Sequence, residues 1–458
     1  KKELFEGLKI MKLEEEWSEH PVIRPDMSGA GATAAEIKDY LNLEFSKYEA
    51  LYSIKPKETS RESVRFQVIL DTAYQKTGKQ VVVLIDEYDS PLQHSWKTPE
   101  HEGCTEVYRS VFSVLKLKGN VLRFVFITGI TKFTQISLFS VLNHLTNISF
   151  LPQFAPLCGI TEEEMTVNFA PELEALADKM ECSIEEAHDK LKTYYDGYHF
   201  SDENMTDIYN PFSLLNALSQ LRLRNYWISS GATSMLNKFV NNMELRLHDF
   251  EDCYIDKDTL ETSDVIEGGS ELFLYQTGYL TIKGFDEDGY SLGFPNEEVR
   301  KALYKAVLPA LTQKDITDIV SIQSRLMHSM NNGNLEEAKQ CMKSLISNVP
   351  YSNKKLASMD MEERYRLIIS TILNAIGCQV EVEHMLSTGR IDIVASTSRF
   401  IYVMELKLAN NGGINAAEKQ MIDNGYLKPF LADDRKVIGV AVELDDMGKG
   451  LIDWKEVK

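Results

Sequence analysis

Residues 389–408 read GRIDIVASTSRFIYVMELKL, two apolar runs joined by a short polar segment. Side chains alternate between the two faces of a strand, so Asp392 points away from its isoleucine neighbours, and Glu405 and Lys407 share one face. If the two runs pair as antiparallel strands, these three charged side chains converge on one surface. Two carboxylates placed in this way can hold a divalent cation such as Mg²⁺ through oxygen ligands.

This arrangement of charges predicts chemistry at a phosphate ester. A bound divalent cation lowers the pKa of a water molecule and neutralises charge on the phosphate. Lys407 would position that water or stabilise the negative charge that develops. We expect Asp392 and Lys407 to be at least partly exposed, because burying an unpaired charge is costly. The alternative is a pair of solvated strands that carry ordinary surface charges.

The segments around this stretch indicate a separate module at the C-terminus. Residues 351–458 carry 14 Lys and Arg against 16 Asp and Glu, whereas the whole chain carries 49 against 69. The predicted order of elements is helix, three strands, helix and strand, or αβββαβ. Periodicity places these elements at residues 361–376, 379–384, 389–396, 400–408, 416–424 and 436–443.

Length and composition set the outer limits. The chain has 458 residues, enough for two to four domains, and its 43% apolar content is that of an ordinary globular protein. A net charge of −20 argues against a generally basic nucleic-acid binder, although a local groove can still be positive. No apolar run reaches the ~20 residues of a membrane span. The six cysteines lack metal-ligand spacing and indicate reduced thiols in a cytoplasmic protein.

The N-terminal third alternates helix and strand patterns. In VVVLIDEYDSP (81–91), five apolar residues run without a polar break, which predicts a strand buried on both faces of a parallel sheet. A second such strand is predicted within residues 121–133. Helices alternating with buried strands imply a parallel sheet with helices on both sides. The helices are predicted at residues 34–48, 60–75 and 106–116.

Asp86 and Glu87 follow the first of these strands directly. Ligands bind at the carboxyl edge of parallel sheets, and in P-loop NTPases this is the Walker B position. There the Asp holds Mg²⁺ through water and the Glu orients the attacking water. Thr128 ends the next strand and could sense the γ-phosphate. The alternative is that Asp86 and Glu87 only cap a loop.

The middle of the chain is predicted to be mainly helical from Thr161 to about residue 231, with Thr161 and Glu164 as a capping box. Residues 271–295 have a β-like pattern, with LFLYQ as the first strand. Two more helical stretches follow at residues 296–311 and 315–347. The motif YYDGYHF (194–200) allows a base-stacking platform, but aromatic residues at this density more often form core.

Five motifs look like successive motifs of one bacterial family. In chain order they are VVVLIDEYDSPL, FITGITKFTQISLFSVLNHLTNIS, LCGITEEEM, YYDGYHF and YNPFSLLNAL. The chain thus resembles the AAA-ATPase-like family, whose members join an ASCE-type P-loop NTPase domain to a PD-(D/E)XK nuclease-like domain. The resemblance implies an AAA-ATPase-like α/β domain at 1–160, a mainly helical lid and connector with a small β segment at 161–347, and a small αβββαβ restriction-endonuclease-like domain at 351–458.

The resemblance to PD-(D/E)XK nucleases extends to two further residues. It implies that Glu362, on the preceding helix, is an extra metal ligand, and that Gln420 matches a helix Gln that is frequent in these nucleases. One departure is Ile391, which stands where the family name has Pro. A linker is predicted at residues 348–355.

A larger departure concerns ATP. A phosphate cradle requires Gly-x-x-x-x-Gly-Lys-Ser/Thr, and the sequence has no such motif. SGAGATAAE (28–36) is rich in Gly but lacks the Lys and follows the wrong strand. The resemblance implies a P-loop upstream of Lys1. We therefore expect ATP as a cofactor of the full-length protein only, and no ATP hydrolysis by this chain.

Three functions are compatible with these observations. The first is an ATP-controlled, Mg²⁺-dependent nuclease or nucleic-acid processing protein that acts on DNA in preference to RNA. The second is an NTPase switch of signalling or defence type, whose C-terminal module only binds nucleic acid or a partner. The third is a structural remnant with neither activity. We expect a cytoplasmic location, no membrane partner, and allow for a homo-oligomer.

Overall fold

The computed structural model of the protein describes residues 2–55, 61–130, 145–227, 236, 253–262, 269–312, 316–347 and 360–457. The chain divides into two units. One comprises Lys1–Ile148 and Asp258–Gly269, and the other Ser149–Lys257 and Ser270–Lys458. The predicted linker at 348–355 lies outside the described residues, and the three predicted domain ranges remain predictions.

The first unit is built on a parallel sheet in the order β1-β2-β3. Its strands are β1 (Val22–Ile23), β2 (Val81–Ile85) and β3 (Leu122–Ile127). The central position of β2 agrees with its uninterrupted apolar run. The unit's helices are α1 (Ile10–Leu13), α2 (Ala34–Leu51), α3 (Glu62–Thr77), α4 (Ser90–Ser95), α5 (His101–Leu117) and most of α12 (Lys257–Thr262).

The two faces of this sheet differ in burial. Helices α2, α3 and α5 pack on the face of Val83 and Ile85, which are 0% and 4% exposed. On the other face, Val22 and Phe124, which flank Val82 in the register, are 45% and 52% exposed. The prediction of helices on both sides is therefore wrong for the described residues. An apolar run identifies a strand, but it does not show which faces are covered.

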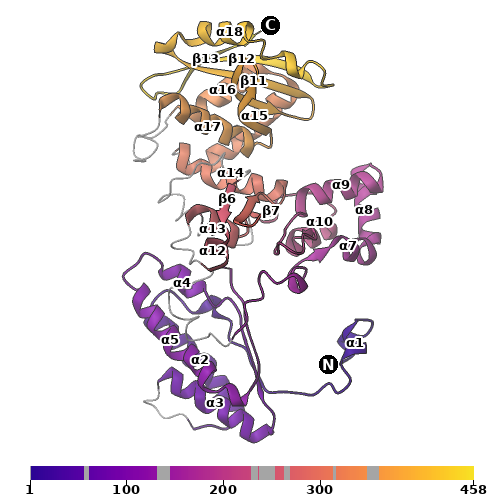
Figure 1. The fold of residues 1–458 in the computed structure, drawn as a ribbon, viewed down its shortest axis with the longest axis vertical. Helices are drawn as coiled ribbons and strands as arrows, with labels where there is room; N and C mark the ends of the chain where they lie inside the picture. Colours follow the sequence, from indigo (N-terminus) through magenta and orange to yellow (C-terminus); the bar gives the residue numbers. More distant parts are fainter. Residues whose placement is uncertain are drawn as a thin grey trace. The chain divides into compact units, whose positions relative to one another are not determined.

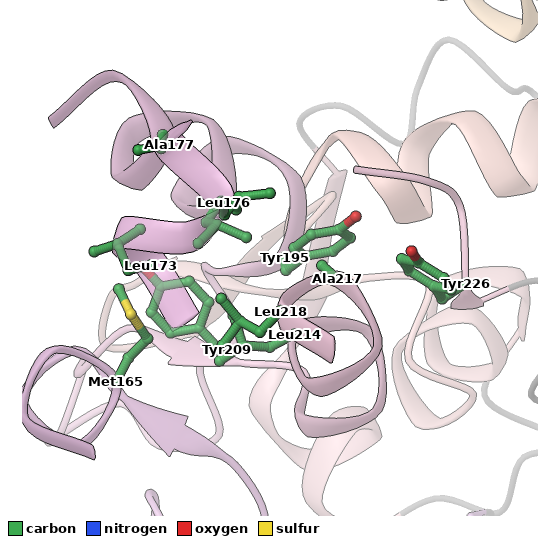
Figure 2. Close-up of a cluster of buried hydrophobic side chains, with 12 residues drawn as sticks. Met165, Leu173, Leu176, Ala177, Tyr195, Tyr209, Leu214, Ala217, Leu218 and Tyr226 are labelled. Atoms are coloured by element: carbon green, nitrogen blue, oxygen red, sulfur yellow. The ribbon is translucent and has the colours of Figure 1, made fainter. Parts of the chain in front are cut away.

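The second unit begins with a helical region. It contains β4 (Ile160–Thr161), α7 (Glu162–Asn168), α8 (Ala170–Met180), α9 (Ile184–Tyr195), β5 (Ile208–Tyr209) and α10 (Pro211–Gln220). The predicted capping box is present, because Glu164 N–H donates to Thr161 Oγ1 and the Glu164 carboxylate accepts from Thr161 N–H. Tyr195 and Tyr209 are fully buried in the core of this region (Figure 2). The motif YYDGYHF thus contributes to core packing, as expected.

Among the described residues, a small sheet and four helices follow. The sheet has the order β6-β8-β7, with β6 at Cys253–Asp256, β7 at Thr281–Phe285 and β8 at Gly289–Gly293. The helices are α13 (Gly269–Gln276), α14 (Glu297–Thr312), α15 (Ile316–Asn332) and α16 (Leu335–Ile346). The predicted strand LFLYQ is wrong, since these residues lie in α13. Short apolar runs cannot separate buried helix from strand.

The C-terminal region forms a five-stranded sheet in the order β13-β12-β11-β10-β9, in which only the β11–β12 pair is parallel. Helix α18 lies on one side of this sheet and α17 on the other (Figure 1). The elements are α17 (Met361–Ala375), β9 (Gln379–Leu386), β10 (Gly389–Ser396), β11 (Phe400–Leu408), α18 (Gly413–Asp423), β12 (Lys436–Leu444) and β13 (Leu451–Val457). The predicted order αβββαβ is confirmed, and β13 was not predicted.

Helix α17 is fixed to the connector by a buried cation. The guanidinium of Arg300, on α14, donates to the Asn374 side chain and to Cys378 O. It also pairs with Glu297, at 2.9 Å. Arg300 is 7% exposed, so these bonds replace lost hydration and hold α17 against α14.

None of the helices in the described parts of the chain is long and apolar enough to cross a bilayer.

Candidate functional site

The register between β10 and β11 brings Asp392 and Glu405 together. The pairs Ile393–Met404 and Val394–Val403 define this antiparallel register, which continues to place Asp392 opposite Glu405. Lys407 lies two residues beyond Glu405, and its Nζ donates to Glu405 Oε1 at 2.9 Å. The predicted convergence of these three side chains is therefore present in the structure.

The burial of Asp392 differs from the prediction. Its side chain is 8% exposed, whereas we expected partial exposure. The charge is compensated because Oδ2 accepts from Leu406 N–H at 2.8 Å and Oδ1 lies 3.3 Å from Arg366 Nη1. Arg366 belongs to α17, so the cover comes from a helix that the strand pattern of β10 does not reveal.

Glu405 is the most buried member of the site. Its side chain is 1% exposed, and in the described part of the chain Oε2 has no hydrogen-bond partner. Burial raises the pKa of Glu405, and the negative charge of Asp392 raises it further. For Lys407, burial opposes the charged form, but the bond to Glu405 and the nearby Glu362 outweigh this effect and raise its pKa. The site therefore holds an incompletely compensated carboxylate beside a stable ammonium.

Glu362 stands at the start of α17, whose first turn is capped by the Asp360 carboxylate. Its Oε1 lies 3.7 Å from Lys407 Nζ. The pKa of Glu362 is raised, mainly by burial. The nearby Lys407 opposes this rise and the charge of Asp392 adds to it. Glu362 thus pairs with Lys407, and the structure does not place it as a third ligand beside the other two carboxylates.

Gln420 lies on α18 but contacts a different group. Its Nε2 donates to Tyr426 Oη at 3.1 Å, and that hydroxyl donates to Arg390 O at 3.0 Å. The structure therefore links Gln420 to the start of β10 through Tyr426. Its predicted role at the site remains a prediction.

One observation indicates that the carboxylates of Asp392 and Glu405 suit a divalent cation. A buried carboxylate oxygen without a partner, Glu405 Oε2, lies beside a second carboxylate, and a cation would compensate both. Across the described ranges, no group of three or more His, Cys, Asp or Glu is arranged to hold a metal ion. Mg²⁺ needs fewer protein ligands, since it is usually bound by one or two carboxylates together with waters and phosphates.

A second acidic site lies at the carboxyl edge of the β1-β2-β3 sheet. Asp86 follows β2, and its Oδ1 accepts from Thr128 Oγ1 at 2.6 Å. Tyr88 N–H donates to Thr128 O at 3.0 Å, which continues the β2–β3 pairing past the strand ends. Asp86 and Thr128 are therefore neighbours at the end of a central strand, as predicted.

Glu87 adopts an unusual backbone conformation beside Asp86. Its φ of 47° lies in the left-handed region, which is uncommon for residues other than Gly and Asn. Its side chain is exposed. Partial burial raises the pKa of Glu87, as do the carboxylates of Asp26, Asp86 and Asp89. This edge of the sheet thus concentrates negative charge, with Glu87 open to solvent and Asp89 buried.

The Gly-rich stretch 28–36 serves as a helix cap. The Glu36 carboxylate accepts from the N–H groups of Ala32 and Thr33, and Glu36 N–H donates to Thr33 Oγ1. Three backbone donors at the start of α2, on Ala32, Thr33 and Glu36, are therefore used by the cap and not offered to a phosphate. This agrees with the interpretation that the stretch is not a P-loop.

Comparisons with known proteins identify two regions of the chain. Residues 1–139 match the family model described as Predicted AAA-ATPase, and residues 360–454 match that of the PD-(D/E)XK nuclease superfamily. A protein of Azotobacter chroococcum mcd 1, described as "Uncharacterized protein in vnfD 5'region", is 28% identical over 469 residues, covering 96% of this chain and 86% of that protein. No solved structure matches the chain.

Proposed function

Because the chain joins an AAA-ATPase-like region to a PD-(D/E)XK nuclease superfamily region, we propose that it hydrolyses phosphodiester bonds of nucleic acid with a divalent cation. The observation that carries this proposal is the buried pair of Asp392 and Glu405 with Lys407 at 2.9 Å from Glu405. Two facing carboxylates and one adjacent ammonium suit a metal-assisted hydrolysis better than a structural ion pair.

Each residue of the set has a separate task. Asp392 and Glu405 would hold the cation, and the Leu406 N–H fixes the orientation of the Asp392 carboxylate. When bound, a divalent cation supplies an activated water and neutralises charge on the scissile phosphate. Lys407 keeps its proton because of the surrounding carboxylates, and it is placed to stabilise the negative charge that develops in the transition state.

The AAA-ATPase-like region suggests control by a nucleotide, with Asp86 and Glu87 at the Walker B position and Thr128 beside them. The residues of this chain do not fit the phosphates of ATP, because the sequence contains no Gly-x-x-x-x-Gly-Lys-Ser/Thr and the stretch 28–36 caps α2.

One observation favours the second candidate, a module that binds nucleic acid or a partner without cutting it. Arg366 Nη1 lies 3.3 Å from Asp392 Oδ1, so a cationic side chain already compensates one of the two carboxylates. A nuclease-like fold that has replaced its metal by Arg366 would lose catalysis and keep only a binding role.

A cleavage assay separates the two candidates. The chain is incubated with end-labelled single- and double-stranded DNA and RNA, with Mg²⁺ or Mn²⁺, and with EDTA as the metal-free control. We expect metal-dependent cleavage that falls by a factor of about 100 to 1,000 in Lys407→Ala, the loss typical of removing one electrostatic catalyst. Lys455→Ala is the matched control, since Lys455 is exposed and pairs with Glu418. Cleavage at the wild-type rate in Lys407→Ala would refute the proposal.

A further inference from the structure

Three acidic residues occupy facing positions on neighbouring strands of the C-terminal sheet, and two of them are the proposed catalytic pair. The β9–β10 register pairs Ile391 with His384 and Ile393 with Val382, which places Glu383 opposite Asp392. Asp392 in turn lies opposite Glu405 on β11. Like charges directly opposite each other repel, so an arrangement of this kind needs compensation from other residues.

Two arginines converge on Glu383. Arg366 Nη1 donates to Glu383 Oε1 at 2.5 Å, and Arg390 Nη1 lies 3.0 Å from the same oxygen. Arg366 is 10% exposed, whereas Glu383 and Arg390 are 44% and 50% exposed. One carboxylate oxygen therefore joins a buried arginine to an exposed one at the surface of the module.

The backbone at Glu383 departs from regular strand geometry. Its φ of 58° lies in the left-handed region, which interrupts the pairing of β9 with β10 at this residue. At this irregular position the Glu383 carboxylate contacts the two guanidinium groups of Arg366 and Arg390.

From this geometry we propose that Arg366 and Arg390 form a binding subsite for a backbone phosphate of nucleic acid, and that Glu383 occupies this subsite until nucleic acid displaces it. A phosphate oxygen carries the same charge as a carboxylate oxygen and accepts the same guanidinium donors. This inference rests on the proposed function, and it names the group that positions the substrate beside Asp392.

The local charge balance explains why displacement matters. Around the site, Arg366, Arg390 and Lys407 face the carboxylates of Glu362, Glu383, Asp392 and Glu405, so anions exceed cations by one. A polyanion would be repelled from this surface. When the Glu383 side chain leaves the arginines, Arg390 becomes available for phosphate contacts, as do the Arg366 donors that Asp392 does not hold, and affinity for nucleic acid increases.

The test measures binding of a labelled single-stranded 20-nucleotide DNA by fluorescence anisotropy, in EDTA, over a series of salt concentrations. We expect Glu383→Gln to tighten binding about three- to tenfold and to steepen the slope of log affinity against log salt by about one phosphate contact. Adding Arg390→Gln should reverse this gain. Glu381→Gln is the matched control, because it removes the same charge from the same strand at a residue that pairs with His384 instead.

Three outcomes would overturn the inference. The first is that Glu383→Gln binds DNA no more tightly than Glu381→Gln, and the second is that neither the wild type nor the variants bind. The third is that Glu383→Gln abolishes Mn²⁺ binding measured by calorimetry, which would make Glu383 a metal ligand. Glu383→Asn is a second variant that removes the same charge, and Asn adopts the left-handed conformation readily. It should tighten DNA binding as Glu383→Gln does. EDTA prevents cleavage, so the binding assay tests the phosphate subsite alone. The cleavage assay with metal tests the nuclease proposal separately.

Discussion

Two aspartates in this molecule lie beside an arginine, Asp86 just after strand β2 and Asp392 within strand β10, and the two pairs differ in burial. Arg24 Nη2 lies 3.6 Å from Asp86 Oδ2, with the side chains 65% and 46% exposed. Arg366 Nη1 lies 3.3 Å from Asp392 Oδ1, with the side chains 10% and 8% exposed. Similar distances therefore correspond to different energies, because water screens the first pair and is largely excluded from the second.

The neighbouring carboxylates extend this difference. Glu87, next to Asp86, is exposed and can be hydrated, so its charge needs no partner. Glu405, opposite Asp392, is 1% exposed and retains an unpartnered oxygen. A buried carboxylate in that state favours either a proton or a cation. On the proposed function, we therefore expect the C-terminal pair, rather than the N-terminal one, to bind a metal.

The largest expected effect concerns catalysis. Asp392→Asn should lower metal-dependent cleavage by at least about 100-fold, whereas Asp86→Asn should leave it unchanged. The Asn side chain can still accept from Leu406 N–H, so the fold around β11 is retained. Rates of oligonucleotide cleavage, with melting curves of both variants as the control for folding, check this prediction. Equal losses in the two variants would remove the distinction between the sites.

The next effect concerns stability. Arg366→Ala should lower the free energy of unfolding by about 3 kcal/mol, because it leaves the buried Asp392 carboxylate without its cation. Urea unfolding followed by circular dichroism measures this change. A loss below about 1 kcal/mol would mean that the Asp392 carboxylate is hydrated in solution and does not need Arg366.

A pH dependence follows from the raised pKa of Glu405. Between pH 4.5 and about 7, Glu405 keeps its proton in the folded protein, whereas the unfolded chain has released it. The free energy of unfolding therefore falls as pH rises through this range. Mg²⁺ should restore about 1 kcal/mol at roughly five times its dissociation constant near pH 8, and almost nothing near pH 5. Melting temperatures with and without Mg²⁺ check this. In Glu405→Gln, the stabilisation by Mg²⁺ should no longer differ between pH 8 and pH 5.

The smallest effect is expected at the exposed pair. Arg24→Ala should change the free energy of unfolding by at most about 0.5 kcal/mol, because a hydrated ion pair contributes little. The same urea experiment applies, with Arg366→Ala measured in parallel. If the two variants lose equal stability, exposure does not distinguish the pairs.

Local periodicity predicted much of the C-terminal site. The two-residue alternation of strands placed Asp392, Glu405 and Lys407 on one surface, and the structure brings them together. The burial of Asp392 could not be predicted in this way, because it depends on Arg366, which lies on another element. The same holds for Glu383, whose left-handed backbone conformation has no sequence signal in a strand pattern.

The fold was predictable to a similar degree. The strand β2 and the order of elements from α17 to β12 followed from apolar patterns and caps. The exposed face of the N-terminal sheet did not, since Phe124 looks like a core residue in sequence. Strand β13 was missed because its buried residues recur every third position, which is not the two-residue alternation of a strand.

Metal binding tests the central claim most directly. Calorimetric titration of the chain with Mn²⁺ should detect a site that Glu405→Gln abolishes and that Glu87→Gln leaves intact. Both variants remove one carboxylate charge, so they differ only in which acidic pair is affected. Loss of binding in Glu87→Gln with retention in Glu405→Gln would contradict the account, as would the absence of any binding by the wild-type chain.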